Sequence, residues 1–161
     1  TGVQTCALPI WYTLRRVWRT VDEPRVVTWV LLNPSTADEF TSDPTIRRCT
    51  AFSSSWGFDE LMIVNAYAWR STDPKVLPRI PDPVGRGNDA AILAACACAE
   101  LVVCGWGKNL RQPRRAALAR LLADVKLTAL QLNDDGSPAH PLYLKGSLTP
   151  QPFIIAEVTD G

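Results

Sequence analysis

The stretch "VVTWVLLNPSTADEFTSDPTIRR", from Val26 to Arg48, contains the transition that decides the fold. Its first seven residues are apolar or β-branched without interruption, which is typical of a strand buried on both faces of a sheet. Hydrophobicity ends abruptly at Asn33, where small polar residues begin. A helix is predicted next, because Asp43 is a favourable N-cap and Pro44 suits the first helical position. The segment therefore predicts a buried strand that opens into a polar loop before a helix.

The rest of the chain repeats this alternation of strand and helix. Three further buried strands are predicted, in "ELMIVNAYAW" (60–69), "LVVCGW" (101–106) and "LTALQL" (127–132), and residues 11–20 alternate enough for another strand. Helices are predicted over residues 43–57, after an N-cap at Asn88, and over residues 111–125. This alternation predicts an α/β fold, a three-layer α/β/α sandwich with a mainly parallel four-stranded central sheet.

Length and composition indicate one ordinary globular domain. The chain has 161 residues, with 47% hydrophobic and 20% charged residues and a net charge of +1. The first ten residues, "TGVQTCALPI", read as a translated sequencing adapter, so we expect residues 11–161 to form a single α/β domain with a truncated N-terminus. The small net charge excludes a globally basic surface, so a nucleic-acid partner would need a local basic patch. No apolar run approaches the ~20 residues that span a bilayer, and no membrane partner is expected.

The cysteines predict thiols rather than a metal site. Cys49, Cys96, Cys98 and Cys104 form no CxxC pair, and two of them lie in an Ala-rich helical segment. Small buried thiols fit a reducing compartment, so a cytoplasmic location is expected, with no metal and no other cofactor. We also expect a monomer.

Polar residues follow each predicted strand at its carboxyl end. Asn33 ends the first buried strand, Asn65 lies near the end of the second, Trp106 ends the third between two glycines, and His140 follows the fourth. In open parallel sheets ligands bind at this edge. The sequence therefore predicts that these groups form one site.

Five motifs occur in order along the chain: "LLNPSTAD…DPTIRR", "VNAYAWRSTDP", "DPVGRGND", "VVCGWG" and "HPLYL". Together they resemble a prokaryotic and phage family known as domain of unknown function 1643. More distantly, the same ordered elements are similar to the uracil-DNA glycosylase superfamily. That superfamily has an Asp or Asn before Pro after its first strand, an Asn in an apolar second strand, and a His-Pro loop last. Here these are Asn33-Pro34, Asn65 and His140-Pro141.

The resemblance implies a uracil-DNA glycosylase-like fold and hydrolysis of the N-glycosidic bond of a flipped or modified nucleobase, with nucleic acid, mainly DNA, or a nucleotide as partner. Asn33 would position the attacking water, His140 would stabilise the departing base, Asn65 would read a pyrimidine edge, and Ser35 would help to hold phosphate. The catalytic candidates are Asn33 and His140. The substrate-binding candidates are Pro34, Ser35, Thr36, Asp43, Arg47, Asn65, Tyr67, Trp106 and Pro141.

Structural explanations of the same residues stay open. Asn33 before proline can simply end a strand through an Asx-type turn, and Asp43 can serve only as an N-cap. Two other functions also fit the sequence. One is a binding module that holds a nucleotide or modified nucleic acid without turnover. The other is a different nucleotide hydrolase or transferase in which Asp43 or Asp38 is the working carboxylate.

Overall fold

The computed structural model describes residues 3–5, 11–34 and 43–156 of the chain. These residues form one seven-stranded sheet in the order β1-β2-β4-β3-β5-β6-β7. The strands are β1 (Val3–Thr5), β2 (Trp11–Val17), β3 (Val26–Leu31), β4 (Glu60–Asn65), β5 (Leu101–Cys104), β6 (Leu127–Ala129) and β7 (Gln151–Phe153). The helices are α1 (Pro44–Ser55), α2 (Asn88–Ala97) and α3 (Arg114–Leu121), with short 3₁₀ helices η1 (Pro74–Arg79) and η2 (Pro141–Tyr143).

The four strands expected to be parallel form the middle of the sheet. β3 pairs in parallel with β4 and with β5, and β5 pairs in parallel with β6. The sheet has seven strands instead of the four predicted for the central sheet, because antiparallel strands extend both sides, one of them in the predicted strand segment 11–20. β2 borders β4 and carries β1, and β7 borders β6. The fold is therefore α/β with a mixed, mostly parallel sheet.

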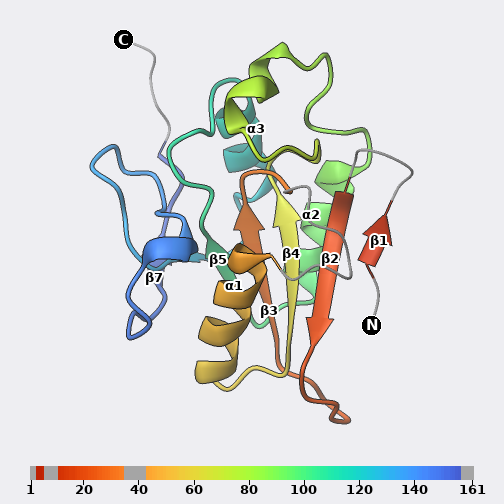
Figure 1. The fold of residues 1–161 in the computed structure, drawn as a ribbon, viewed down its shortest axis with the longest axis vertical. Coiled ribbons are helices and arrows are strands. Elements are labelled where there is room, and N and C mark those ends of the chain that lie inside the picture. Colours follow the sequence, from red (N-terminus) through yellow and green to blue (C-terminus); the bar gives the residue numbers. More distant parts are fainter. Residues whose placement is uncertain (1–2, 6–10, 35–42, 157–161) are drawn as a thin grey trace.

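Helices cover both faces of this sheet (Figure 1). On one face, α1 buries Cys49 and Phe52 in a cluster with Trp29 and Leu61 of the sheet. On the other face, α2 and α3 contribute to a second cluster with Val30, Val64 and other sheet residues. Because neighbouring strand residues point to opposite faces, each central strand supplies both clusters, which explains its continuous apolar sequence. Within the described ranges, no helix has the length and apolar composition needed to cross a membrane.

The order of the parallel strands creates a crevice at one edge of the sheet. The chain leaves β3 to form β4 on one side, then crosses over to form β5 on the other side of β3. Such a reversal separates the loops that follow two adjacent strands, and ligands bind outside the carboxyl ends of the strands at this point. In Figure 1 the long segment after β4 rises above this edge. The topology therefore predicts a ligand site at the loops that follow β3, β4 and β5.

The predicted N-cap of α1 is confirmed, whereas that of α2 is wrong. The Asp43 carboxylate accepts a hydrogen bond from the backbone N–H of Thr45 at 2.6 Å, and Gly57 follows α1 with φ +87°. α2 instead has Gly87 at its N-cap position, without a side-chain capping bond. Asn88 is the first helical residue, and its side chain donates to carbonyls beyond β4. The position of Asn88 before a helical pattern predicts a cap, but its bonding partners lie at the end of β4 and directly after it.

Three of the four described cysteines are buried free thiols, at positions 49, 96 and 104. Cys98 is exposed, which corrects the expectation that all were buried. It follows the last turn of α2 on the solvent side, where helical periodicity turns it away from Cys96.

Candidate functional site

A cavity of about 670 Å³ lies at the carboxyl ends of the parallel strands. Its volume is in the range of small-molecule and cofactor sites. The walls come from β2, from the ends of β3 and β4, and from the segments that follow β5 and β6. The start of α1, the segment that leads into η1 and the loop around η2 complete them. Its polar lining includes Asn33, Asp43, Asn65, Ser71, Lys108, Asn109, Gln131, Asn133 and His140.

Two asparagines reach the cavity from the ends of neighbouring strands, Asn65 as the last residue of β4 and Asn33 two residues after the end of β3. In β3, Trp29 and Leu31 belong to the cluster under α1, and Asn33 comes two residues later. In β4, Ile63 belongs to the same cluster, and Asn65 is the next residue of that row. Side chains two apart in a strand share a face, so the Asn65 amide continues the apolar row of β4 on the α1 side. Asn33 lies beyond the last residue of β3 and is placed by the loop that follows this strand.

Among the cavity residues, Asn65 gives the strongest indication of ligand binding. Its side chain is only 5% exposed and lines the cavity. No other described residue forms a hydrogen bond with its side-chain amide. The amide faces the open volume of the cavity, where water or a ligand can bond its donor and its acceptor. A ligand in the cavity would satisfy it.

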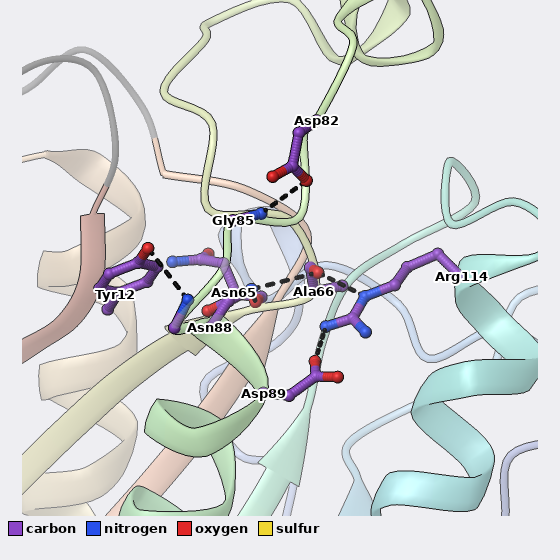
Figure 2. A network of polar contacts seen from close by, with 9 residues as sticks. Tyr12, Asn65, Ala66, Asp82, Gly85, Asn88, Asp89 and Arg114 are labelled. Carbon is purple, nitrogen blue, oxygen red and sulfur yellow. Dashed lines mark hydrogen bonds and ion pairs between the residues drawn. The ribbon is translucent and has the colours of Figure 1, made fainter.

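The backbone beneath Asn65 is fixed by a buried polar network (Figure 2). The Asn88 side chain donates to the carbonyl oxygens of Asn65 at 2.8 Å and Ala66 at 3.3 Å. Arg114 at the start of α3 donates to the same Ala66 oxygen at 2.7 Å and forms an ion pair with Asp89 at 2.8 Å. The end of β4 is thus tied to the first turns of α2 and α3. This network accounts for part of the "DPVGRGND" motif, because it holds the backbone that carries Asn65.

Glycines of the same motif allow β2 to pack closely. Gly85 has φ +89° and donates its N–H to the Asp82 carboxylate at 3.1 Å (Figure 2). The Gly87 N–H donates to the hydroxyl of Tyr12 at 3.1 Å. A Cβ at Gly85 would lie 3.0 Å from the Tyr12 ring and 3.1 Å from Cβ of Ala68. The motif is therefore explained by packing behind the cavity rather than by contact with a ligand.

Gly85→Ala is expected to destabilise the fold more than Gly136→Ala. Both glycines have positive φ, but no heavy atom lies within 4 Å of a Cβ built at Gly136. The control should lose about 1–2 kcal/mol of unfolding free energy from backbone conformation alone. Gly85→Ala should lose about 1–3 kcal/mol more through overpacking. Urea unfolding measures both, and equal losses would contradict the packing role of Gly85.

Asn33 has a clear structural role in addition to lining the cavity. Its Nδ2 donates to the carbonyl oxygens of Ser71 at 2.8 Å, Pro34 at 3.2 Å and Trp69 at 3.4 Å. The side chain thereby holds the segment after β4 against the end of β3. Among the described residues, no hydrogen bond to its Oδ1 is present. Asn33 can therefore offer a ligand or water an acceptor, but its donor group is already used.

His140 presents a neutral donor to the cavity. Its Nδ1 accepts a hydrogen bond from the backbone N–H of Leu142 at 3.3 Å, which assigns the ring proton to Nε2. Burial lowers the pKa of His140, while the negative charge of Asp43 acts in the opposite direction. A neutral imidazole is the form that both burial and the Leu142 bond favour. The ring is thus prepared to donate from Nε2 at neutral pH.

The His140 loop is anchored on α1 by Arg48. The Arg48 guanidinium donates to the carbonyl oxygen of Leu144 and lies over the ring of Phe52, 4.7 Å from its centroid. This contact joins the loop that carries His140 to the helix that begins at Asp43.

The start of α1 is poorly suited to phosphate. Free N–H groups at a helix start favour anions, but here the Asp43 carboxylate already bonds the Thr45 N–H. A more favourable position for an anion lies elsewhere in the cavity lining, where Lys108 and Asn109 follow β5. An anionic group of a ligand would be more favourable beside Lys108 than beside Asp43.

The other predicted site residues are divided between the cavity and its surroundings. Pro34 and Trp106 line the cavity. Tyr67 is buried in the cluster on the α2 side, and Arg47 is exposed on α1; neither is among the lining residues. Pro141 packs beneath the site, with its Cδ 3.0 Å from a Cβ built at Gly105. Ser35, Thr36 and Asp38 lie outside the described residues.

The sequence analysis missed several cavity residues. Lys108 and Asn109 follow β5, and Gln131 and Asn133 follow β6. Their position after strand ends was the available signal, since the same rule selected Asn33 and Asn65. Within the described part of the chain, no cluster of three or more His, Cys, Asp or Glu side chains is arranged to hold a metal ion.

His140 is expected to titrate below its usual pKa of 6.5. It is the only histidine of the chain, so its imidazole signals can be followed by NMR without overlap. Asp43→Asn keeps a capping side chain and should lower this pKa further, because the Asp43 charge raises it. The folded pKa is depressed, so the stability that neutral His140 contributes is complete above the unfolded pKa and is lost as pH falls through the folded pKa. A pKa above 6.5, or a rise in Asp43→Asn, would contradict this assignment.

Comparison with known proteins identifies a family. The family described as "Protein of unknown function (DUF1643)" matches residues 11–142, which is most of the chain. Comparisons with curated proteins and with solved structures give no match.

Proposed function

The chain belongs to the DUF1643 family of proteins of unknown function, and we propose that it binds a pyrimidine nucleobase and hydrolyses its N-glycosidic bond. The base would belong to DNA, as a flipped or modified nucleotide, or to a free nucleotide. The observation that carries the proposal is the Asn65 amide, which lines the same cavity as His140 and forms no side-chain hydrogen bond with another described residue. An amide supplies one donor and one acceptor side by side, which matches the alternating donors and acceptors of a pyrimidine edge. A relationship to the uracil-DNA glycosylase-like fold is part of this proposal.

Two charges develop in the proposed glycosidic cleavage, a negative charge on the base and a positive charge on the sugar. As the C1′–N bond breaks, the base takes the electron pair and the sugar becomes oxocarbenium-like. The Nε2–H of His140 donates to the carbonyl oxygen on which the negative charge develops. Water adds to C1′, oriented by the Asn33 Oδ1, and its proton passes to solvent or to the departing base. Asn33 is not a strong base, so this mechanism favours substrates with a good leaving group.

A second candidate is a hydrolase that uses Asp43 as its general base. Asp43 and His140 line the same cavity, and the Asp43 charge acts on the His140 imidazole. A carboxylate can accept the proton of water, which Asn33 cannot. In this case Asn33 would serve mainly to hold the Ser71 segment.

One assay separates these functions from simple binding. The protein is incubated with DNA and with free nucleosides that carry a panel of modified pyrimidines, and abasic sites and free bases are measured. Base release that falls in His140→Ala and Asn33→Ala supports the first proposal. Release that survives Asn33→Ala but is lost in Asp43→Asn supports the second candidate. Binding without any release would identify a binding module, and release of phosphate instead would point to another nucleotide hydrolase.

A further inference from the structure

The cavity contains an apolar compartment that a base alone would not fill. Its apolar lining comprises Leu31, at the level of Asn65, and Leu14 and Ile63 below that level, from three adjacent strands, with Ile46 of α1 and Leu144 beside η2. The sheet residues are 5–6% exposed, so they are buried yet face open volume. The charged lining residues, Asp43 and Lys108, come instead from the loops above the strand ends.

Strand register connects this compartment to the proposed base-reading group. Leu31 pairs with Asn65 across β3 and β4, and Ile63 precedes Asn65 by two residues on the same face. Leu14 of β2 pairs with Ile63. Two strand residues correspond to about 6.6 Å, so the compartment extends about that far below the Asn65 amide. A base held by Asn65 would therefore border the apolar floor directly.

The apolar lining determines which ligand groups this compartment favours. Water molecules form few hydrogen bonds in a space with few polar groups. Transfer of the apolar surface of a ligand from solvent into such a space is favourable. We propose that the cavity takes a pyrimidine whose ring carries an apolar substituent, with the base edge on Asn65 and the substituent over Leu14, Leu31 and Ile63. This inference rests on the proposed function, which it extends from nucleobases in general to bases with bulky apolar modifications.

The test measures how affinity depends on the substituent. 2′-Fluoro pyrimidine nucleosides resist glycosidic cleavage and are titrated calorimetrically, in one series with unbranched alkyl groups of increasing length at C5 and in another with these groups on the exocyclic N4. In one of the two series, affinity should rise by about fourfold for each added methylene, from the transfer free energy of one CH₂ group. The rise should stop when the substituent exceeds about 6.6 Å.

Two variants test whether the gain in affinity with substituent length arises in the apolar compartment. Ile46→Phe and, independently, Leu144→Phe narrow the compartment and should remove the gain with length while the unsubstituted nucleoside still binds. Ala51→Phe adds the same ring at an exposed position of α1 that does not line the cavity, and should leave the gain intact. Thermal unfolding of each variant verifies that it is folded. If only one of Ile46→Phe and Leu144→Phe folds, that variant alone is sufficient for the test.

The outcomes distinguish this inference from the function on which it rests. If unsubstituted nucleosides bind but affinity does not rise with length in either series, the apolar compartment is not used and only this inference is overturned. If no nucleoside binds at all, the proposed function fails and takes this inference with it. A gain with length that persists in both Ile46→Phe and Leu144→Phe would place the substituent elsewhere and also overturn the inference.

Discussion

His140→Ala is expected to slow base release by about 10²–10³-fold, the effect of removing one preorganised donor to a developing negative charge. The His140 ring is held with Nδ1 as an acceptor from Leu142, so Nε2–H is the donor that faces a ligand. Burial keeps the imidazole neutral, and a neutral donor needs no proton uptake at pH 7. The loss should appear mainly in kcat, because the interaction strengthens as the base becomes anionic.

A conservative variant and a neighbour provide the controls. His140→Gln retains a neutral N–H donor and should recover part of the lost rate, while Lys145→Ala, exposed in the same loop, should leave the rate unchanged. If His140→Ala releases base at the wild-type rate, His140 does not stabilise the leaving group. If His140→Gln is as slow as His140→Ala although both variants are folded, the loss comes from loop geometry rather than from a donor.

Asn65→Leu is expected to weaken pyrimidine binding by about 5- to 150-fold without lowering stability. The first effect follows from leaving polar groups of the base unpaired, which costs about 1–3 kcal/mol. The second follows from the absence of a described hydrogen-bond partner for the Asn65 side chain, so that leucine of similar size removes no hydrogen bond to the described part of the chain. We expect the ligand-free variant to be as stable as the wild type or more stable, as at other sites where function opposes stability.

Asn88→Ala is the matched comparison, because this asparagine is equally buried but bonded. It donates to the carbonyl oxygens of Asn65 and Ala66, so its loss should lower the unfolding free energy by about 1–3 kcal/mol. Calorimetric binding and urea unfolding of both variants separate the roles. A stability loss in Asn65→Leu as large as that in Asn88→Ala would show that Asn65 is a structural residue.

The central sheet was predictable because its strands are buried on both faces. β3, β4 and β5 stand out as predominantly apolar runs, because both faces of each strand are covered by helices. β1 and β7 have only three residues each, too short for a periodic pattern, and their pairing depends on neighbours distant in sequence. The alternation of β and α elements specified layers, but the number of strands at each border depended on these short segments.

The site was predictable to the extent that strand ends define it. Asn33, Asn65, Trp106 and His140 do line one cavity. Tyr67 would share the face of Asn65 if β4 continued, but the strand ends at Asn65 and alternation ends with it. Asn88 bonds carbonyls that come near it only in the folded chain, so its sequence position before a helix suggested only a cap.

The most direct test of nucleobase binding is a titration of ¹⁵N-labelled protein with non-hydrolysable pyrimidine nucleosides, observed through the side-chain NH₂ signals of Asn65 and the Nε2 signal of His140. We expect both residues to shift along one saturable binding curve, while the NH₂ signals of Asn88, which is fully buried and bonded to backbone, move much less. Unchanged Asn65 and His140 signals throughout the titration, or saturable shifts confined to residues outside the cavity, would contradict the account.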